Sequence, residues 1–329
     1  MTYHRERQAA IDAVRKACAF CQDIQTSHFA QRMIEKGDRS PVTIADFGAQ
    51  ALINDHLKTV FPCDGLIAEE NTRLLVKEEN TSLREAVVAQ ILKHNPLLSR
   101  QRIFEAIDLG SGRVRPEGRF WIIDPIDGTK GFLRGDQYAV ALALINGGQV
   151  VLGVLGCPNL VIHGFGSHDA GTLFVALKEE GSVMRGLVSP AERKISVSTL
   201  TDPSQAQVCE SFEPAHSSHS VAATVARILG IKKEPLRMDS QAKYGVVAMG
   251  DASIYIRLPL QRTYQEKIWD HAPGSIIVEE AGGKVTDIEG KPLDFSRGNQ
   301  LTANKGVIAT NGNLHEPLIQ AIRQASSSP

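Results

Sequence analysis

Apolar side chains near the start of the chain recur at the spacing of an α-helix. The pattern predicts an amphipathic helix over about Arg7–Met33, ended by the segment Gly37–Pro41. A second helix is predicted to open near Thr43 and to run through Ala45–Val60. We therefore expect the chain to begin with two helices joined by a short breaker.

Short apolar runs predict strands further along the chain. These runs are Leu66–Ala68, Phe120–Ile123, Tyr138–Ile145, Val150–Leu155, Thr172–Leu177 and Lys194–Ser198. The sequence Asn146-Gly147-Gly148-Gln149 separates two of them and is a strong hairpin signal. By contrast, residues Asn71 to Glu117 are polar and weakly periodic, apart from a helical stretch near Ser82–Lys93. We interpret them as a lid or excursion.

The second part of the chain alternates between helical and strand patterns. The helical stretches are Ser218–Leu229, Ala242–Met249 and Pro273–Ala281, and the strands are Ala252–Leu258, Lys284–Asp287 and Val307–Thr310. This alternation indicates an α/β layer. The segment Ser198–Gln207, rich in Ser, Thr, Asp and Pro, is the best candidate boundary. We therefore expect an α+β domain at residues 1–198 and an α/β domain at residues 199–329.

Composition narrows the class of protein. The 329 residues are 42% hydrophobic and 22% charged, and the formal net charge is -1. This balance lacks the basic footprint of a nucleic-acid binder, so an anionic ligand would be met by placed residues or metals. No apolar run approaches the roughly 20 residues that cross a bilayer. The charged start, Met1–Arg7, lacks the apolar stretch of a secretory signal. We expect a cytoplasmic protein that engages neither nucleic acid nor membrane.

The cysteines support the same compartment. They are Cys18, Cys21, Cys63, Cys157 and Cys209. An odd, scattered set argues against a disulfide scaffold. Cys18 and Cys21 form a C-x-x-C, which is compatible with zinc or redox chemistry. However, both fall on the apolar face of the first predicted helix, and no second pair completes a metal site. Buried packing is therefore the favoured interpretation.

The sharpest chemical feature is Asp124-Pro125-Ile126-Asp127-Gly128-Thr129, at the end of a fully apolar strand pattern. Two carboxylates three positions apart on a tight turn can face one point, and Mg²⁺ prefers such oxygen ligands. The amides of Gly128 and Thr129 could face a phosphate. Taken alone, the motif could equally be an ordinary turn, because Asp and Gly are common in turns.

Other acids fall at comparable positions. Glu69 and Glu70 follow a short apolar strand, and Asp270 follows a bulky apolar pair at a predicted helix start. Taken alone, Asp270 reads as a helix N-cap and Asp46 as a capping acid after Thr43. Their occurrence together, in this order, favours a shared site.

These four elements resemble the lithium-sensitive phosphatase superfamily, which includes inositol monophosphatases and fructose-1,6-bisphosphatases. The motifs D-P-[ILV]-D-G-T and W-D-x-[AP]-x-G carry the likeness. Further segments are similar to the 3'(2'),5'-bisphosphate nucleotidases of that superfamily. They are Asp38–Asp46, Asp127–Gly135, Glu213–His219, Asp239–Tyr244 and Tyr264–Asp270. The likeness runs from about Tyr3 to Asn311 and is weakest across Asn71–Glu117. Ala68 and Pro273 depart from the common Gly and Ala.

The resemblance implies a layered αβαβα sandwich and a two- or three-metal site inhibited by Li⁺. In that arrangement Glu69, Asp124 and the Ile126 carbonyl hold one Mg²⁺. Asp124, Asp127 and Asp270 hold a second, and a weaker third ion lies near Glu69. The Thr129 hydroxyl and Asp46 accept the proton of the attacking water in an in-line displacement, and Glu70 supports the ligands.

The resemblance also implies the substrate, adenosine 3',5'-bisphosphate, with its 3'-phosphate on the metals. His216 is placed near the nucleoside, and Ser240, Lys243 and Arg257 around the remaining phosphate. Taken singly, Lys243 and Arg257 read as solvated surface charges and His216 as a loop histidine. The rival functions are an inositol polyphosphate 1-phosphatase on the same fold and a nucleotide-binding sensor without turnover. Activity on 3'-phosphoadenosine 5'-phosphosulfate stays open, and we expect a monomer.

Overall fold

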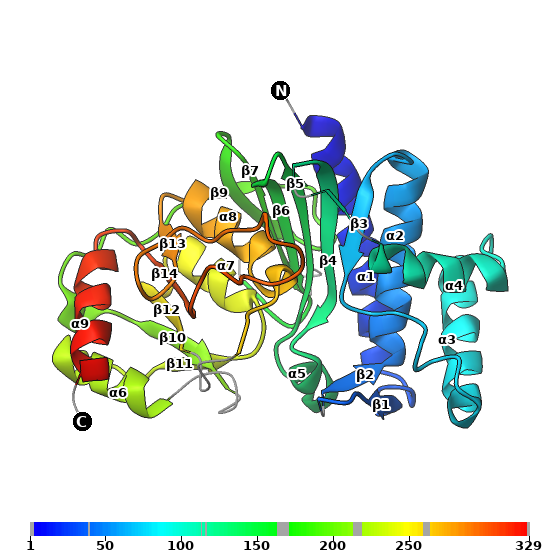
Figure 1. Cartoon of the computed structure of the whole chain (residues 1–329), viewed down its shortest axis with the longest axis horizontal. Helices are drawn as coiled ribbons and strands as arrows, with labels where there is room; N and C mark the ends of the chain where they lie inside the picture. Colours follow the sequence, from blue (N-terminus) through cyan, green and yellow to red (C-terminus); the bar gives the residue numbers. More distant parts are fainter. Residues whose placement is uncertain are drawn as a thin grey trace.

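Two large sheets alternate with three helical layers in the described part of the chain, and a separate two-stranded sheet is formed by β1 (Met33–Glu35) and β2 (Pro41–Thr43). The computed structural model describes residues 3–38, 40–112, 114–115, 117–162, 171–212, 219–258 and 264–327. Figure 1 shows α1 and α2, a seven-stranded sheet, α7 and α8, a five-stranded sheet, and finally α6 and α9. The expected αβαβα layering is confirmed.

The first sheet is mostly antiparallel. In spatial order it contains β3 (Gly65–Ala68), β4 (Arg119–Asp127), β5 (Ala139–Asn146), β6 (Gln149–Cys157), β7 (Thr172–Leu177), β8 (Gly181–Gly186) and β9 (Arg193–Ile195). Only β3 and β4 run parallel. The β5–β6 turn uses Gly147 and Gly148 at φ 59° and 75°, the left-handed values that a two-residue hairpin turn requires. The predicted hairpin is therefore confirmed.

The second sheet joins parallel and antiparallel pairs. Its order is β11 (Leu236–Met238), β10 (Val208–Ser211), β12 (Ile254–Arg257), β14 (Val307–Thr310) and β13 (Lys284–Thr286). The helices α6 (His219–Ile228) and α9 (His315–Ser327) lie at its outer side, as Figure 1 shows. Between the sheets lie α7 (Ala242–Ala248) and α8 (Ala272–Glu280).

The middle helical layer is packed tightly. Glycine at position 274 lets α7 and α8 approach, because a Cβ there would come within 2.2 Å of the Tyr244 ring. Their apolar side chains form one buried cluster with side chains of both sheets. The two predicted domains therefore share a core, and the boundary at Ser198 stays a prediction. The segment between the sheets carries a short 3-10 helix, Pro203–Gln205.

The first helix is shorter than the sequence pattern indicated. α1 spans His4–Gln25, and Met33–Glu35 forms strand β1, which pairs antiparallel with β2 (Pro41–Thr43). Backbone pairing in this hairpin replaces the last turns of the predicted helix. The second helix, α2 (Ile44–Val60), begins as predicted, with Thr43 as its N-cap.

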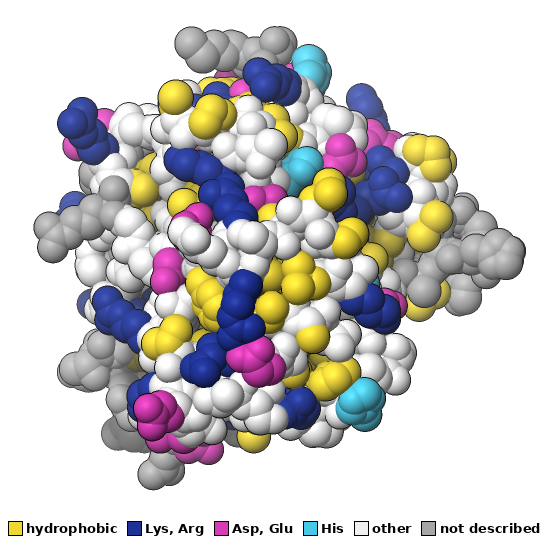
Figure 2. All heavy atoms as spheres, turned by 90° about the vertical axis from the view of Figure 1, so that its right-hand side faces the viewer, with side chains coloured by type: hydrophobic (Ala, Val, Ile, Leu, Met, Phe, Trp, Pro, Cys, Tyr) yellow, Lys and Arg dark blue, Asp and Glu magenta, His cyan; other side chains and the backbone are white. Residues whose placement is uncertain are grey.

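The segment from Asn71 to Glu117 is an excursion between β3 and β4 and not a lid, so the lid interpretation was wrong. It contains α3 (Thr81–His94) and α4 (Arg100–Asp108), and both pack against α2. The helical stretch predicted near Ser82–Lys93 is confirmed. Val87, Ile91 and Ile103 are buried in the same core as α1 and α2. Figure 2 shows the face that carries these helices, where acidic and basic side chains are interspersed. This face therefore offers no broad region of one charge.

The free thiols of α1 serve packing. Cys18 and Cys21 are fully buried, and a Cβ at position 156 would come within 2.3 Å of the Cys18 sulfur. Burial raises the pKa of both thiols, which keeps them protonated and unreactive. The packing interpretation is confirmed. Among the described residues, no helix has the length and apolar character that a membrane span needs.

Candidate active site

Two acids at the end of β4 are separated by an irregularity in the strand. Asp124 pairs with Ala141 of β5 and Asp127 with Ala139, so the register shifts between them. Such a bulge bends a strand and re-aims its side chains. The chain then turns at Gly128, whose φ of 85° lies in the left-handed region. The two carboxylates therefore come from a bent strand end, and the tight turn follows them.

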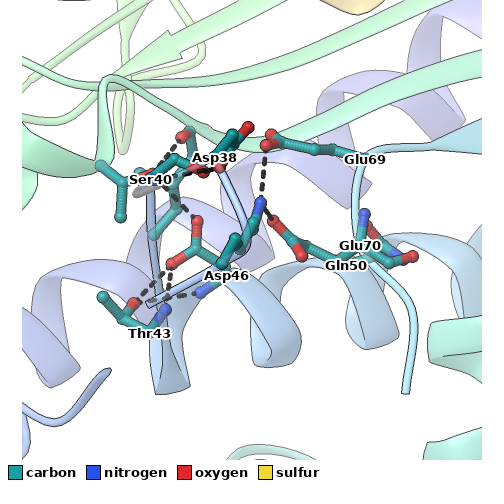
Figure 3. Close-up of polar contacts among 10 residues, drawn as sticks. Asp38, Ser40, Thr43, Asp46, Gln50, Glu69 and Glu70 are labelled. Carbon is teal, nitrogen blue, oxygen red and sulfur yellow. Dashed lines mark hydrogen bonds and ion pairs between the residues drawn. The ribbon is translucent and has the colours of Figure 1, made fainter. Parts of the chain in front are cut away.

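Asp46 serves two elements at once. Its Oδ2 accepts hydrogen bonds from the backbone N–H and the hydroxyl of Thr43, at 2.8 and 2.6 Å. This capping box starts α2. Its Oδ1 accepts from the Thr129 hydroxyl at 3.3 Å, and that hydroxyl also lies 3.1 Å from the Ile126 carbonyl oxygen. Figure 3 shows Asp46 between Thr43 and the acids of the next strand. The capping and catalytic interpretations of Asp46 use different oxygens, so both fit the geometry.

Glu69 and Glu70 enter the site from the end of β3. Because β3 and β4 are parallel, their carboxyl ends meet at one edge of the sheet. Gln50 of α2 fixes the backbone of Glu70 by accepting from its N–H at 2.9 Å and donating to its carbonyl at 2.7 Å. Lys36 pairs with both glutamates, at 2.8 Å from Glu69 Oε1. Figure 3 shows the two carboxylates pointing toward the Asp46 side of the site.

Asp270 reaches the same place from the second half of the chain. It ends a 3-10 helix, Ile268–Asp270, that lies against β4 and β5. The N-cap of α8 is His271, whose side chain makes no capping bond. The N-cap interpretation of Asp270 is therefore wrong, and its carboxylate is available to the site.

The acids repel one another. Burial, followed by the charges of Glu69, Asp127 and Asp270, raises the pKa of Asp124 well above its ordinary value. Burial and neighbouring acids also raise the pKa of Asp270 and Glu70. Burial raises the pKa of Asp46 to about 6, against hydrogen bonds from Thr43 that lower it. Buried acids that repel one another in this way are typical of a site that binds a cation.

The donor set fits a hard divalent cation. Asp124 is 2% exposed, yet its Oδ1 has no hydrogen-bond partner among the described residues. A buried polar group without a hydrogen-bond partner lowers the stability of the fold by about 1–3 kcal/mol, and by more when the group is charged, as a carboxylate is. A metal ligand bond would remove that penalty. Glu69, Asp127 and Asp270 lie close enough to perturb Asp124.

The second half of the chain forms the side of the site that faces these acids. We call this side the facing wall, and it contains Ser240, Lys243 and Arg257. A Cβ on Gly128 would come within 3.2 Å of the Ser240 Cβ, so the turn and this wall touch. Ser240 has a φ of 69°, and the following residue, Gln241, donates its N–H to Asp127 Oδ2 at 2.6 Å. Lys243 is buried and donates to the Ser240 carbonyl at 2.7 Å. Burial lowers the pKa of Lys243, and the nearby Asp127 opposes that shift.

Arg257 belongs to a paired network in this wall. Its Nε lies 2.8 Å from Glu266 Oε2, and its Nη2 donates to Asp270 Oδ2 at 3.2 Å. Glu266 Oε2 also lies 3.1 Å from His271 Nε2. Sequence reasoning missed Glu266 and His271, although both stand beside Asp270 in the Tyr-Gln-Glu-Lys-Ile-Trp-Asp-His run. It also missed Lys36.

The predicted site residues thus meet in one place, with one exception. The metal candidates Glu69, Asp127 and Asp270 each raise the pKa of Asp124, after burial, and the Thr129 hydroxyl lies within hydrogen-bond distance of Asp46 Oδ1 and the Ile126 carbonyl. Ser240, Lys243 and Arg257 belong to the facing wall, and the turn at Gly128 touches it. His216 lies outside the described residues. The roles assigned to all these residues stay predictions.

The acids at the bent end of β4 lie where the second half of the chain covers the first sheet. The chain matches the model of the inositol monophosphatase family over residues 3–327 and belongs to that family. A 3'(2'),5'-bisphosphate nucleotidase of Oryza sativa is 44% identical over 98% of this chain and 95% of its own length. A protein of the same name from Emericella nidulans is 43% identical over 98% and 99%.

Solved structures share the fold. An inositol monophosphatase from Anabaena has a TM-score of 0.64 at 21% identity, covering 98% of this chain and 97% of its own. An IMPase from Thermotoga maritima has a TM-score of 0.66 at 22% identity, covering 96% of each chain. These likenesses confirm the predicted fold class.

Proposed function

We propose that this chain hydrolyses the 3'-phosphate of adenosine 3',5'-bisphosphate in the presence of Mg²⁺, giving AMP and phosphate. The observation that carries the proposal is the cluster of mutually repelling acids, in which the buried Asp124 Oδ1 has no hydrogen-bond partner among the described residues, in a chain 44% identical to a relative named for that substrate class. The reaction adds water across the phosphorus–oxygen bond, and the departing 3'-oxygen takes up a proton.

The acids divide into two sets of metal ligands around Asp124. Glu69, Asp124 and the Ile126 carbonyl would hold one Mg²⁺, and Asp124, Asp127 and Asp270 the other. A third ion would bind near Glu69. When bound, such ions lower the pKa of a coordinated water and neutralise phosphate charge. Glu70 and Gln50 keep the β3 end in place.

Two side chains handle the proton. The Thr129 hydroxyl donates to Asp46 Oδ1, so its own oxygen can accept a hydrogen bond from the attacking water. Asp46 would then receive a proton through Thr129. The other oxygen of Asp46 is held by Thr43, which fixes the direction of the first. Positioning of this kind dominates phosphoryl transfer.

The wall of the second half would hold the rest of the substrate. The amides of Gly128 and Thr129 would face the scissile phosphate, and Ser240, Lys243 and Arg257 the other one. Lys243 and Arg257 are already paired in the structure, so a phosphate would replace the Ser240 carbonyl or Asp270 as their partner. His216 would contact the nucleoside. We also propose a cytoplasmic monomer; light scattering tests its oligomeric state.

A substrate panel tests the proposal. Phosphate release is measured on adenosine 3',5'-bisphosphate, its 2',5' isomer, 3'-phosphoadenosine 5'-phosphosulfate and inositol 1,4-bisphosphate, each with Mg²⁺. We expect the adenosine bisphosphates to be the best substrates, EDTA to abolish activity and Li⁺ to inhibit it. Full activity in chelator would contradict the metal centre. Faster release from the inositol bisphosphate would favour a polyphosphate 1-phosphatase, and tight nucleotide binding without release would favour a sensor.

A further inference from the structure

Arg257 has two acidic partners of different kinds. Its Nε forms an ion pair with Glu266 Oε2 at 2.8 Å, although this Nε makes no hydrogen bond among the described residues. Its Nη2 donates to Asp270 Oδ2 at 3.2 Å and contacts the Tyr264 hydroxyl at 3.4 Å. The Arg257 side chain is 13% exposed and that of Glu266 is 4% exposed. One partner is therefore deep in the protein, while the other belongs to the proposed metal site.

Glu266 is held from its far side. Its Oε2 lies 3.1 Å from His271 Nε2, and His271 Nδ1 lies 2.7 Å from the Tyr244 hydroxyl. An ionised carboxylate can only accept, so His271 donates from Nε2. Burial lowers the pKa of His271, so its neutral Nδ1 accepts from Tyr244. This fixed chain of donors leaves Glu266 little freedom to move.

Asp270 is the partner that can change. Its Oδ2 accepts from Arg257 Nη2 at 3.2 Å, and Asp127 and Glu69 lie near enough to repel its carboxylate. A divalent cation and the Arg257 guanidinium would compete for Asp270 Oδ2. Whichever takes it, Glu266 can still hold Arg257 through Nε.

We propose that Glu266 is a positioning residue that anchors Arg257 by Nε, while Asp270 is the exchangeable partner of its Nη groups. Arg257 then competes with Mg²⁺ for Asp270 in the free enzyme, and metal binding releases those Nη groups for the second phosphate of the substrate. The inference rests on the proposed function. It makes metal binding and bisphosphate binding mutually favourable.

Calorimetric Mg²⁺ titration of the free protein tests the competition without any activity readout. Arg257→Met removes the competitor and should raise Mg²⁺ affinity by about three- to tenfold. Glu266→Gln removes one of the two carboxylates that pair with Arg257 and leaves Asp270 as the other. Arg257 should then hold Asp270 more strongly, and Mg²⁺ affinity should fall by a similar factor of about three to ten. In the double variant, Glu266→Gln should have little further effect, because its influence passes through Arg257.

The matched control is Asp64→Asn, which removes a comparable carboxylate from Arg119 at 2.9 Å, in a different part of the first sheet. It should leave Mg²⁺ affinity unchanged, and thermal unfolding shows which variants are folded. If Glu266→Gln lowered Mg²⁺ affinity equally with and without Arg257, its charge alone would explain the effect and the anchoring role would be wrong. A decrease in affinity on Arg257→Met would also overturn it.

Substrate kinetics separate this inference from the proposed function. At saturating Mg²⁺, Glu266→Gln should reduce kcat/KM for adenosine 3',5'-bisphosphate by about tenfold and leave adenosine 3'-monophosphate nearly unaffected. Equal losses on both substrates would overturn the anchoring of the second phosphate. If the parent released no phosphate from any bisphosphate but the Mg²⁺ affinities moved as expected, the proposed function would fail and the competition would be supported. A parent that bound no Mg²⁺ would overturn both.

Discussion

The two sides of the site carry charge in opposite ways. At the end of the first sheet, Asp124 keeps an unpaired oxygen and shares its surroundings with other acids. Across from it, Lys243 and Arg257 are buried or nearly so, and each is matched to a carbonyl or a carboxylate. The acid side therefore keeps an uncompensated carboxylate oxygen, whereas Lys243 and Arg257 already have partners and must exchange one of them to bind a ligand.

The difference indicates how the fold supports each side. Clustered acids destabilise the free protein, so the rigid strand ends and the Gln50 contacts must hold them in place. Lys36 offsets part of this charge from the β1–β2 hairpin. On the basic side, Arg257 is paired with Glu266 and Asp270, and Lys243 donates to the Ser240 carbonyl. Replacing an acid should therefore raise the stability of the metal-free protein and lower the activity. Replacing a basic residue should lower both the stability and the activity.

The largest expected effect comes from Asp124→Asn. The change removes a negative charge from both proposed metal positions, so phosphate release should fall by about 10³-fold or more, as electrostatic stabilisation of the transferring group is lost. Mg²⁺ affinity should fall as well, measured by calorimetry. The metal-free variant should unfold at a higher temperature than the parent, because repulsion is relieved.

Asp251→Asn, at an exposed position, is the control for a lost acid. Its activity and unfolding temperature should match the parent. A lower unfolding temperature for metal-free Asp124→Asn would contradict the claim that this acid is uncompensated.

Asp46→Asn tests whether Asp46 is a metal ligand or a proton acceptor. Loss of a positioned base typically costs about 10²–10⁴-fold in turnover, and we expect a fall of that order at saturating Mg²⁺. Mg²⁺ affinity should stay near the parent value, since Asp46 faces Thr129 and Thr43. Calorimetry and single-turnover kinetics measure the two quantities. If Asp46→Asn lost metal as severely as Asp124→Asn, the proton-acceptor role would be wrong.

Lys243→Ala tests the paired side, with a smaller effect. A hydrogen bond to a charged group contributes roughly 1.5–3 kcal/mol, so kcat/KM on adenosine 3',5'-bisphosphate should fall by about ten- to a hundredfold. Adenosine 3'-monophosphate, which lacks the second phosphate, should be hydrolysed slowly and almost equally by parent and variant. Lys291→Ala, an exposed lysine paired with Glu289, is the control. Equal losses on both nucleotides would place Lys243 in the metal centre or the fold.

The sequence predicted those parts of the molecule that depend on local chemistry. Thr43 and Asp46 predict the start of α2, and the glycines at 147 and 148 predict the hairpin. The apolar run before Asp124 predicts the strand that contains it. Each signal is complete within a few residues. The catalytic and ligand assignments came from the resemblance, and they stay predictions.

The remaining features depend on contacts between separate elements. The end of α1 is set by pairing between β1 and β2, which helical periodicity cannot register. The strands β10 and β11 are too short to predict alone, and each is defined by its neighbours in the sheet. The contacts of Lys36 with Glu69 and of Arg257 with Asp270 likewise join separate elements. They appear only once the fold brings those elements together.

The smallest expected effect concerns a neutral, fully bonded histidine far from the acids. His315 Nε2 lies 2.8 Å from the Thr286 hydroxyl and Nδ1 lies 2.9 Å from the Thr310 hydroxyl. Thr286 donates its own proton to the Asp287 carbonyl, so His315 donates from Nε2 and accepts at Nδ1. A second proton on Nδ1 would have to displace the hydroxyl proton of Thr310.

Burial, followed by the nearby charge of Lys284, lowers the pKa of His315 from 6.5 to about 4. The unfolded chain therefore binds this proton at a higher pH than the folded chain does. Stability from this group is present above pH 6.5 and is lost as the pH falls from 6.5 toward about 4. Replacing His315 with Gln removes the titration, so the variant should lose less stability than the parent across that window. The difference should be roughly 1–2 kcal/mol after solvent screening. Thermal unfolding of the metal-free proteins at both ends of the window measures it, with exposed His4→Gln as the control. If His315→Gln and the parent lost the same stability, the pKa of His315 would be the same in the folded and the unfolded chain, and the lowering by burial would be contradicted.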